Sequence, residues 1–218
     1  MVALQKISLF SNISTEDLEK VYDCLAPHKR IINRDTFVFR ANDPVRNIYI
    51  ILSGRMHIVD EFFWGNRSII ETMEPYTLFG EAYVLSSTER HLVSVIAAED
   101  SEVLEIDPVR LFEICPSKCD CHMQLMQNTM QLLSKKIVRL TEKLEHIMQR
   151  TTRDKVLSYL TQYMHQTQSN HFDIPYSRQQ LADYLCVDRS ALSHELSKLK
   201  EEGVIDYHKN NFKLLIQS

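Results

Sequence analysis

The densest group of reactive side chains in the sequence lies in one eight-residue segment near its middle. It holds four possible metal ligands, Cys115, Cys119, Cys121 and His122. Thiolates and imidazole suit zinc or an iron–sulfur cluster, and the same thiols could act as a redox switch. Their spacing matches neither paired C-x-x-C motifs nor the C-x-x-C-H motif of covalent haem, and free cysteines are often small buried packing residues. Ordinary packing is therefore the favoured interpretation of these residues, and a metal or redox site is the alternative.

Groups suited to catalysis are sparse in the part of the chain that precedes this segment. Only His57, Glu81 and His91 stand out there as side chains that could converge on a metal ion, and no nucleophile stands at a useful spacing from a base. We therefore predict that the chain is not an enzyme. A metal-dependent enzyme built on this half of the chain is the less favoured alternative.

Two short helices joined by a tight turn are predicted near the C-terminus. A polar loop is expected at residues 165–172, after which Ser177 and Gln180 form a capping box that begins the first helix. A turn at residues 186–188, whose last residue is expected to act as the cap, precedes a second helix at residues 189–202. The pattern is typical of a helix-turn-helix.

The second of these helices is predicted to read DNA. Leu192, Leu196 and Leu199 line one face and leave polar side chains on the other. The apolar face would pack on the preceding helix while exposed residues reach base edges in the major groove, and strands within residues 204–216 would form a wing. An arginine such as Arg189 can bond to guanine O6 and N7 together. The predicted DNA-binding residues are Arg189, Ser190, Ser193 and His194 on this helix, and Arg178, Gln179, Lys198 and Lys209 as phosphate contacts.

A long helix is expected to position these groups by joining two copies of the chain. From Met123 to Met148 the apolar residues alternate at spacings of three and four, and the positions between them hold good helix formers without Gly or Pro. Because a strict seam of this length is narrower than packing on a globular core requires, it predicts a coiled-coil homodimer, with packing on the chain's own core as the alternative. The seam residues are Met123, Met126, Met130, Leu133, Ile137, Leu140, Leu144 and Ile147.

The first half of the chain is predicted to be rich in strands. A capped helix is expected to begin at Ser14, and from Lys29 the apolar period changes to two. Several short strands then alternate with turn signals, including residues 64–66 and the Gly80-Glu81 pair. Many short strands at near-regular spacing are typical of a sandwich, a roll or a barrel.

The order of these elements resembles the Crp/Fnr family of bacterial transcription regulators over essentially the whole chain. The residues that carry the resemblance are Ser53-Gly54 within paired strands, the Phe79-Gly80-Glu81 turn, the strand pair ending at Ile106-Asp107, and the C-terminal helix-turn-helix. In that family a glycine usually occupies the turn position that is Cys186 here. The resemblance implies a homodimer that binds a palindromic operator under the control of an effector and that, as an activator, contacts RNA polymerase.

The same resemblance implies an α+β fold in three parts. These are a double-stranded β-helix, or jelly-roll, sensor domain at residues 1–121, a dimerisation helix at residues 122–149 and a winged helix-turn-helix at residues 150–218. The iron–sulfur members of the family carry their cysteines chiefly near the N-terminus, where this chain has only Cys24. A cysteine-based redox or metal sensor with this architecture is therefore the alternative.

An effector pocket is implied between the roll and the long helix, with Glu81, Tyr83, His91 and Leu92 as its wall. Members that bind cyclic AMP hold its phosphate with an Arg-Ser pair, and the matching positions here are His91 and Leu92. A cyclic phosphate needs a fixed guanidinium or several N–H donors, which these residues do not supply. Arg90, one residue earlier, would face the other side of a strand. Cyclic AMP is therefore disfavoured, and the effector is unidentified.

Charge is distributed unevenly along the 218 residues. Residues 1–121 hold 12 Lys and Arg against 19 Asp and Glu, residues 122–150 hold 5 against 2, and residues 151–218 hold 8 against 8. The acidic first part is excluded as a nucleic-acid surface, so DNA binding must depend on where the charges of the last part lie. The sequence has no membrane-length apolar run, no signal-peptide pattern and five cysteines, an odd number, so we expect a cytoplasmic protein with reduced thiols and no membrane partner.

Overall fold

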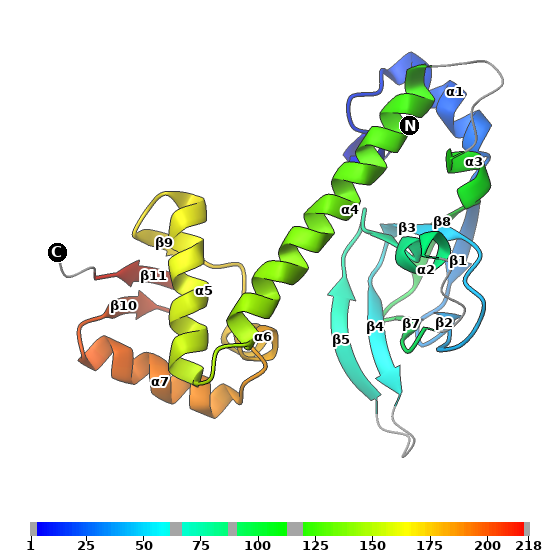
Figure 1. The fold of residues 1–218 in the computed structure, drawn as a ribbon. Helices are drawn as coiled ribbons and strands as arrows, with labels where there is room; N and C mark the ends of the chain where they lie inside the picture. Colours follow the sequence, from blue (N-terminus) through cyan, green and yellow to red (C-terminus); the bar gives the residue numbers. More distant parts are fainter. Residues whose placement is uncertain (1–3, 62–66, 87–90, 113–119, 216–218) are drawn as a thin grey trace. The chain divides into compact units, whose positions relative to one another are not determined.

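Helices and strands divide between two units in the computed structural model, Met1–Leu133 and Ser134–Ser218, each with its own core (Figure 1). The structure describes the chain except for residues 1–3, 62–66, 87–90, 113–119 and 216–218. The turn expected at residues 64–66 lies outside the described residues. Within them, no helix is both long enough and apolar enough to cross a membrane.

Short helices begin the first unit. Two 3₁₀ turns, η1 (Leu4–Lys6) and η2 (Ser8–Phe10), precede α1 (Thr15–Leu25). As predicted, Ser14 caps α1, because its hydroxyl accepts a hydrogen bond from the backbone N–H of Asp17 at 3.1 Å. The apolar face of α1 is fully buried.

Two four-stranded antiparallel sheets follow, which confirms the predicted β-roll. One sheet has the strand order β1-β8-β3-β6 and the other β2-β7-β4-β5. The strands are β1 (His28–Ile32), β2 (Phe37–Phe39), β3 (Ile48–Ser53), β4 (Met56–Glu61), β5 (Arg67–Met73), β6 (Leu78–Phe79), β7 (Ser94–Ala97) and β8 (Ser101–Ile106).

Strand β3 lies between two apolar cores, and this position explains why its sequence is continuously apolar rather than alternating. Tyr49 and Ile51 belong to the core between the two sheets, whereas Ile48 and Ile50 belong to a second core under the N-terminal helices. A strand that is covered on both faces needs apolar residues at every position. The ring of Tyr49 stacks on that of Phe79 across the β3–β6 pair, with 5.1 Å between centroids.

Three helices complete the first unit, and the last of them continues into the second unit. They are α2 (Glu81–Leu85), α3 (Pro108–Phe112) and the long α4 (Asp120–Ile147). The first half of α4 joins the core of this unit through the fully buried Leu125. The side-chain amide of Asn128 donates to the carbonyls of Leu9 and Ser11, at 2.8 and 2.7 Å, and so fixes the N-terminal segment to α4.

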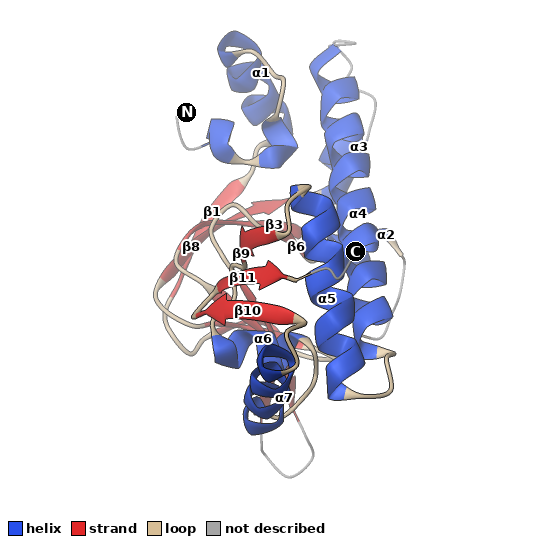
Figure 2. Cartoon of the chain, turned by 90° about the vertical axis from the view of Figure 1, so that its left-hand side faces the viewer, coloured by secondary structure: helices blue, strands red, loops and turns tan. Residues whose placement is uncertain are grey.

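The second unit contains the remaining elements. These are α5 (Thr152–Thr167), β9 (His171–Asp173), α6 (Arg178–Tyr184), α7 (Arg189–Glu201), β10 (Ile205–His208) and β11 (Asn211–Leu214). The polar loop expected at residues 165–172 spans only residues 168–170, because α5 continues to Thr167 and β9, which begins at His171, pairs with β11 (Figure 2). One buried ring, that of Phe172, is enough to anchor this short polar strand in the core, and its neighbours point to solvent.

Candidate reading head and effector pocket

The two helices of the motif form as the sequence predicts. Ser177 and Gln180 make both bonds of the capping box: the Ser177 hydroxyl accepts from the Gln180 backbone N–H, and the Ser177 backbone N–H donates to Gln180 Oε1 at 2.8 Å. Leu181, Ala182 and Leu185 are buried. The capping box fixes the start of α6, and the buried residues of α6 belong to the same core as the leucines of α7.

The turn between them departs from expectation at one residue. Asp188 occupies the N-cap position of α7, but its side chain makes no capping hydrogen bond. Asp188 is exposed, so solvent can satisfy the first N–H groups of α7. This start of α7 is also the end of the helix that carries the predicted base-reading residues.

Cys186 lies in the left-handed backbone region, with φ at 52°. We expect Cys186→Gly to raise the free energy of unfolding by about 0.5–1 kcal/mol, because a left-handed conformation costs a non-glycine residue about 1–2 kcal/mol and the extra chain entropy of glycine offsets about half of it. Urea unfolding measures the change. Cys186→Ala is the control, since it removes the thiol without relieving the backbone; an equal gain in both variants would contradict the prediction.

The two faces of α7 separate by polarity. Leu192, Leu196 and Leu199 are fully buried. The predicted base and phosphate contacts on the opposite face are all exposed, namely Arg189, Ser190, Ser193, His194 and Lys198. An exposed polar face on a helix held firmly by its apolar face is what insertion into a major groove requires.

The other predicted phosphate contacts lie in different environments. Lys209 is exposed between β10 and β11, and Gln179 donates to the carboxylate of Asp183 at 2.8 Å. Arg178 is half-buried, its guanidinium lies 5.1 Å from the ring centre of Tyr207, and burial lowers its pKa. The guanidinium also donates to the Lys209 carbonyl at 3.4 Å, so Arg178 connects α6 to the wing.

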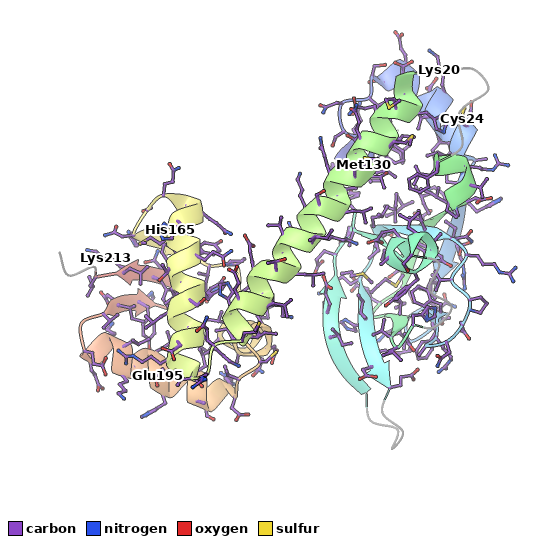
Figure 3. All side chains as sticks on the ribbon, in the orientation of Figure 1. Lys20, Cys24, Met130, His165, Glu195 and Lys213 are labelled. Carbon is purple, nitrogen blue, oxygen red and sulfur yellow. The ribbon has the colours of Figure 1, made fainter. Side chains whose placement is uncertain are left out.

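Two further basic residues, Arg153 and Lys155, contact the helix-turn-helix through the start of α5. Arg153 forms ion pairs with Glu195 and Glu202 on and after α7, and its guanidinium holds the pKa of Glu202 below its usual range. Lys155 donates to the carbonyls of Leu185 and Cys186 in the turn. Figure 3 shows Glu195 where α7 meets the start of α5. Cations in the first turn of a helix oppose its dipole. The unfavourable placement of Arg153 and Lys155 at the start of α5 was therefore a signal in the sequence that they have partners elsewhere.

In the roll, the structure brings together three of the four predicted wall residues. Glu81 begins α2 and is buried; Tyr83 is half-buried two residues later. His91 is 3% exposed, its ring lies 4.6 Å from that of Tyr83, and neither ring nitrogen has a hydrogen-bond partner in the described part of the chain. Burial, and then the charge of Glu81, raise the pKa of Tyr83. Leu92 does not join this cluster, because its side chain is 80% exposed.

The cysteine segment is described only in part. Cys115 and Cys119 lie outside the described residues, as does Arg90. Cys121 is half-buried in α4, and the ring of His122 lies 3.0 Å from the carbonyl of Arg110. The described residues contain no group of three or more His, Cys, Asp or Glu that could hold a metal ion.

The seam of α4 is largely uncovered by its own chain. Five of its members, Met123, Met130, Ile137, Leu140 and Leu144, are each more than half exposed, and Met126, Leu133 and Ile147 are half-buried. Met130 is labelled on α4 in Figure 3. Apolar side chains in such a row usually mark an interaction surface.

Two family models match the chain. One describes the cyclic nucleotide-binding domain and matches residues 29–118; the other describes the Crp-like helix-turn-helix domain and matches residues 154–217. The transcriptional activator protein Anr of Pseudomonas aeruginosa is 22% identical over 208 residues, which cover 93% of this chain and 82% of the relative. The cyclic AMP receptor protein of Thermus thermophilus is 24% identical over 200 residues, 90% of this chain and 87% of the relative.

Solved structures share the fold. The catabolite activator protein of Thermus thermophilus aligns with a TM-score of 0.53 at 21% identity, over 95% of this chain and 93% of that chain. A structure of CprK complexed with OCPA aligns with a TM-score of 0.63 at 14% identity, over 92% of this chain and 89% of that chain.

Proposed function

Because this chain belongs to the Crp/Fnr family and is a transcription regulator of that type, we propose that it acts as a homodimer that binds a palindromic operator through two copies of α7. Its curated relatives include the regulators Anr and FixK. The observation that carries the proposal is the division of α7 into a buried leucine face and an exposed face with Arg189 in its first turn. The exposed seam of α4 supports the dimer.

The reading residues take named roles in this proposal. Arg189 reads a guanine, while Ser190, Ser193 and His194 contact neighbouring bases or phosphates. Lys198, Lys209, Gln179 and the partly engaged Arg178 contact phosphates. We further propose that the protein works in the cytoplasm and, if it is an activator, contacts RNA polymerase.

Selection from a random-sequence duplex library tests the proposal. The full-length protein is expected to enrich a palindrome whose half-sites lie about one helical turn apart, since a two-fold dimer presents its recognition helices at that spacing. Native mass spectrometry of the bound complex should give two chains per duplex. Enrichment of a single, non-repeated site, or of no site, would contradict the proposal.

For the effector, we propose that the cluster of Glu81, Tyr83 and His91 contacts a small molecule other than cyclic AMP. The buried imidazole of His91, which has no hydrogen-bond partner among the described residues, supports this, because a ligand with a polar group could supply that hydrogen bond. Leu92 is exposed and is therefore the weakest member of the predicted wall.

Cyclic AMP is expected not to bind to the pocket. His91 packs between the rings of Phe39 and Tyr83, at 5.5 and 4.6 Å, and offers no guanidinium to a cyclic phosphate. Isothermal titration calorimetry should show no saturable heat with cyclic AMP up to about 1 mM. Saturable binding that is lost in Glu81→Gln would contradict this prediction.

A further inference from the structure

The last turn of α4 is joined by a buried histidine to the reading head, which is the winged helix-turn-helix formed by the elements α5 to β11. His146 is 2% exposed, and its Nδ1 lies 2.8 Å from the hydroxyl of Ser158 on α5. Its ring packs edge-on against Tyr159, with 5.7 Å between centroids, and lies 6.2 Å from the ring of Tyr184 on α6. One side chain thus connects α4, α5 and α6 within the second unit.

The rings around His146 form a cluster that extends to the helix-turn-helix. Tyr159 contacts Tyr184 at 5.5 Å and Tyr163 at 5.8 Å, and Tyr184 stacks on Tyr176 at 5.1 Å. The hydroxyl of Tyr159 is buried without a hydrogen-bond partner in the part of the chain that the structure describes. Water would satisfy that hydroxyl if the cluster opened, so the packed arrangement is held less firmly than an all-apolar one.

Burial favours the neutral form of the His146 ring in this arrangement, against the groups that surround it. Burial lowers the pKa of His146, and the carboxylates of Glu145 and Glu142 on α4 and the amide of Gln162 on α5 oppose that shift. The facing tyrosines carry no charge, because burial raises the pKa of Tyr184 to about 12 and raises that of Tyr159 further.

The sign of the pH effect follows from the direction of this shift. The ordinary pKa of histidine is 6.5, and the packed state holds the value lower. As the pH falls through 6.5, an opened state takes up a proton that the packed state refuses. Acidification therefore favours opening. Lys143 on α4 also faces the cluster, with its ammonium 5.4 Å from the ring centre of Tyr184.

We propose that His146 is a positioning residue that fixes the reading head to the end of the dimer helix, and that protonation of its imidazole releases the head and weakens DNA binding. The inference rests on the proposed function. A reading head held in place binds without first losing orientational freedom, whereas a released head must be ordered when it meets DNA.

The pH dependence of operator affinity tests this role. His194→Gln is introduced into every protein, because His194 is a proposed DNA contact on the exposed face of α7, and a second histidine there would prevent a pH effect from being assigned to His146. With the full-length dimer and a duplex selected at neutral pH, fluorescence anisotropy should show affinity falling about three- to tenfold per pH unit below about pH 6.5, at constant ionic strength.

Two replacements of His146 are expected to remove the pH dependence. His146→Phe keeps a ring in the cluster, and His146→Gln keeps a polar contact for Ser158. Neither replacement side chain titrates. If one variant fails to fold, the other still tests the inference. His165→Phe is the matched control, since His165 is an exposed histidine on α5, and it should retain the fall. The inference would be overturned if operator affinity fell with pH in both His146 variants as much as in the parent protein, or if it did not fall in the parent protein. If no duplex is enriched at neutral pH, the proposed function fails instead.

Discussion

Replacing Leu140 by glutamate is expected to dissociate the homodimer and to weaken operator binding by about 10²–10⁴-fold. Leu140 lies on the seam of α4 and is 62% exposed in the single chain. In a coiled coil this position faces its counterpart, so two carboxylates would be buried against each other without a partner. Each released monomer would bind one half-site and lose the gain that comes from linking two reading heads.

Analytical ultracentrifugation and operator titration measure the two effects together. Gln131→Glu is the matched control, because it adds the same charge at an exposed α4 position away from the seam. The control should remain a dimer and bind the operator normally. A Leu140→Glu protein that stays dimeric would show that the chains associate through another surface.

Arg189→Ala is expected to lower affinity for the selected operator by about 5–150-fold, the equivalent of about 1–3 kcal/mol for one bidentate contact to guanine. The side chain is exposed in the first turn of α7, and it makes no hydrogen bond or ion pair in the described structure that would have to be broken first. The preference for guanine at one position of each half-site should relax at the same time. Competition binding with operators substituted at every position measures both changes.

Lys209→Ala is the comparison that separates base reading from phosphate contact. Lys209 is exposed at the end of the β10–β11 hairpin, so its loss should weaken binding to all sequences alike and reduce the salt slope by about one. If Arg189→Ala weakens operator and unrelated DNA equally, Arg189 contacts a phosphate and another residue must specify the sequence.

The fold was predictable where one physical pattern acted alone. The capping box of Ser177 and Gln180, the leucine face of α7 and the long helix α4 come from local signals, and each formed as expected. Strand β9 was not predictable, because its pairing depends on β11, about forty residues later in the chain, and its own residues are polar. The absence of a capping bond at Asp188 was not predictable either, because it depends on the conformation of an exposed side chain and not on residue type.

The candidate site divides in the same way. Residue type was enough to select Arg189 and Glu81, but it could not show that His91 is buried and Leu92, its neighbour, is exposed, since this requires the conformation of the chain around β7. Arg153, Lys155 and His146 were missed because their partners are distant in sequence or belong to other helices. In the structure these residues contact α7, the turn before it or the neighbouring helices, so a role in DNA reading would come through the position of α7.

Strand β3 raises a question of register that polarity does not answer. In most half-buried strands, a shift of one residue exposes apolar side chains to water and is penalised for that reason. Here residues 48–51 are apolar and buried on both faces, so such a shift would move their side chains from one apolar core to the other rather than into water. What distinguishes the faces is shape: Tyr49 contributes a ring to an aromatic layer with Phe39 and Phe79, whereas Ile48 and Ile50 belong to a core whose buried side chains are mostly aliphatic. Steric fit, rather than affinity for water, therefore determines how this strand aligns with its neighbours.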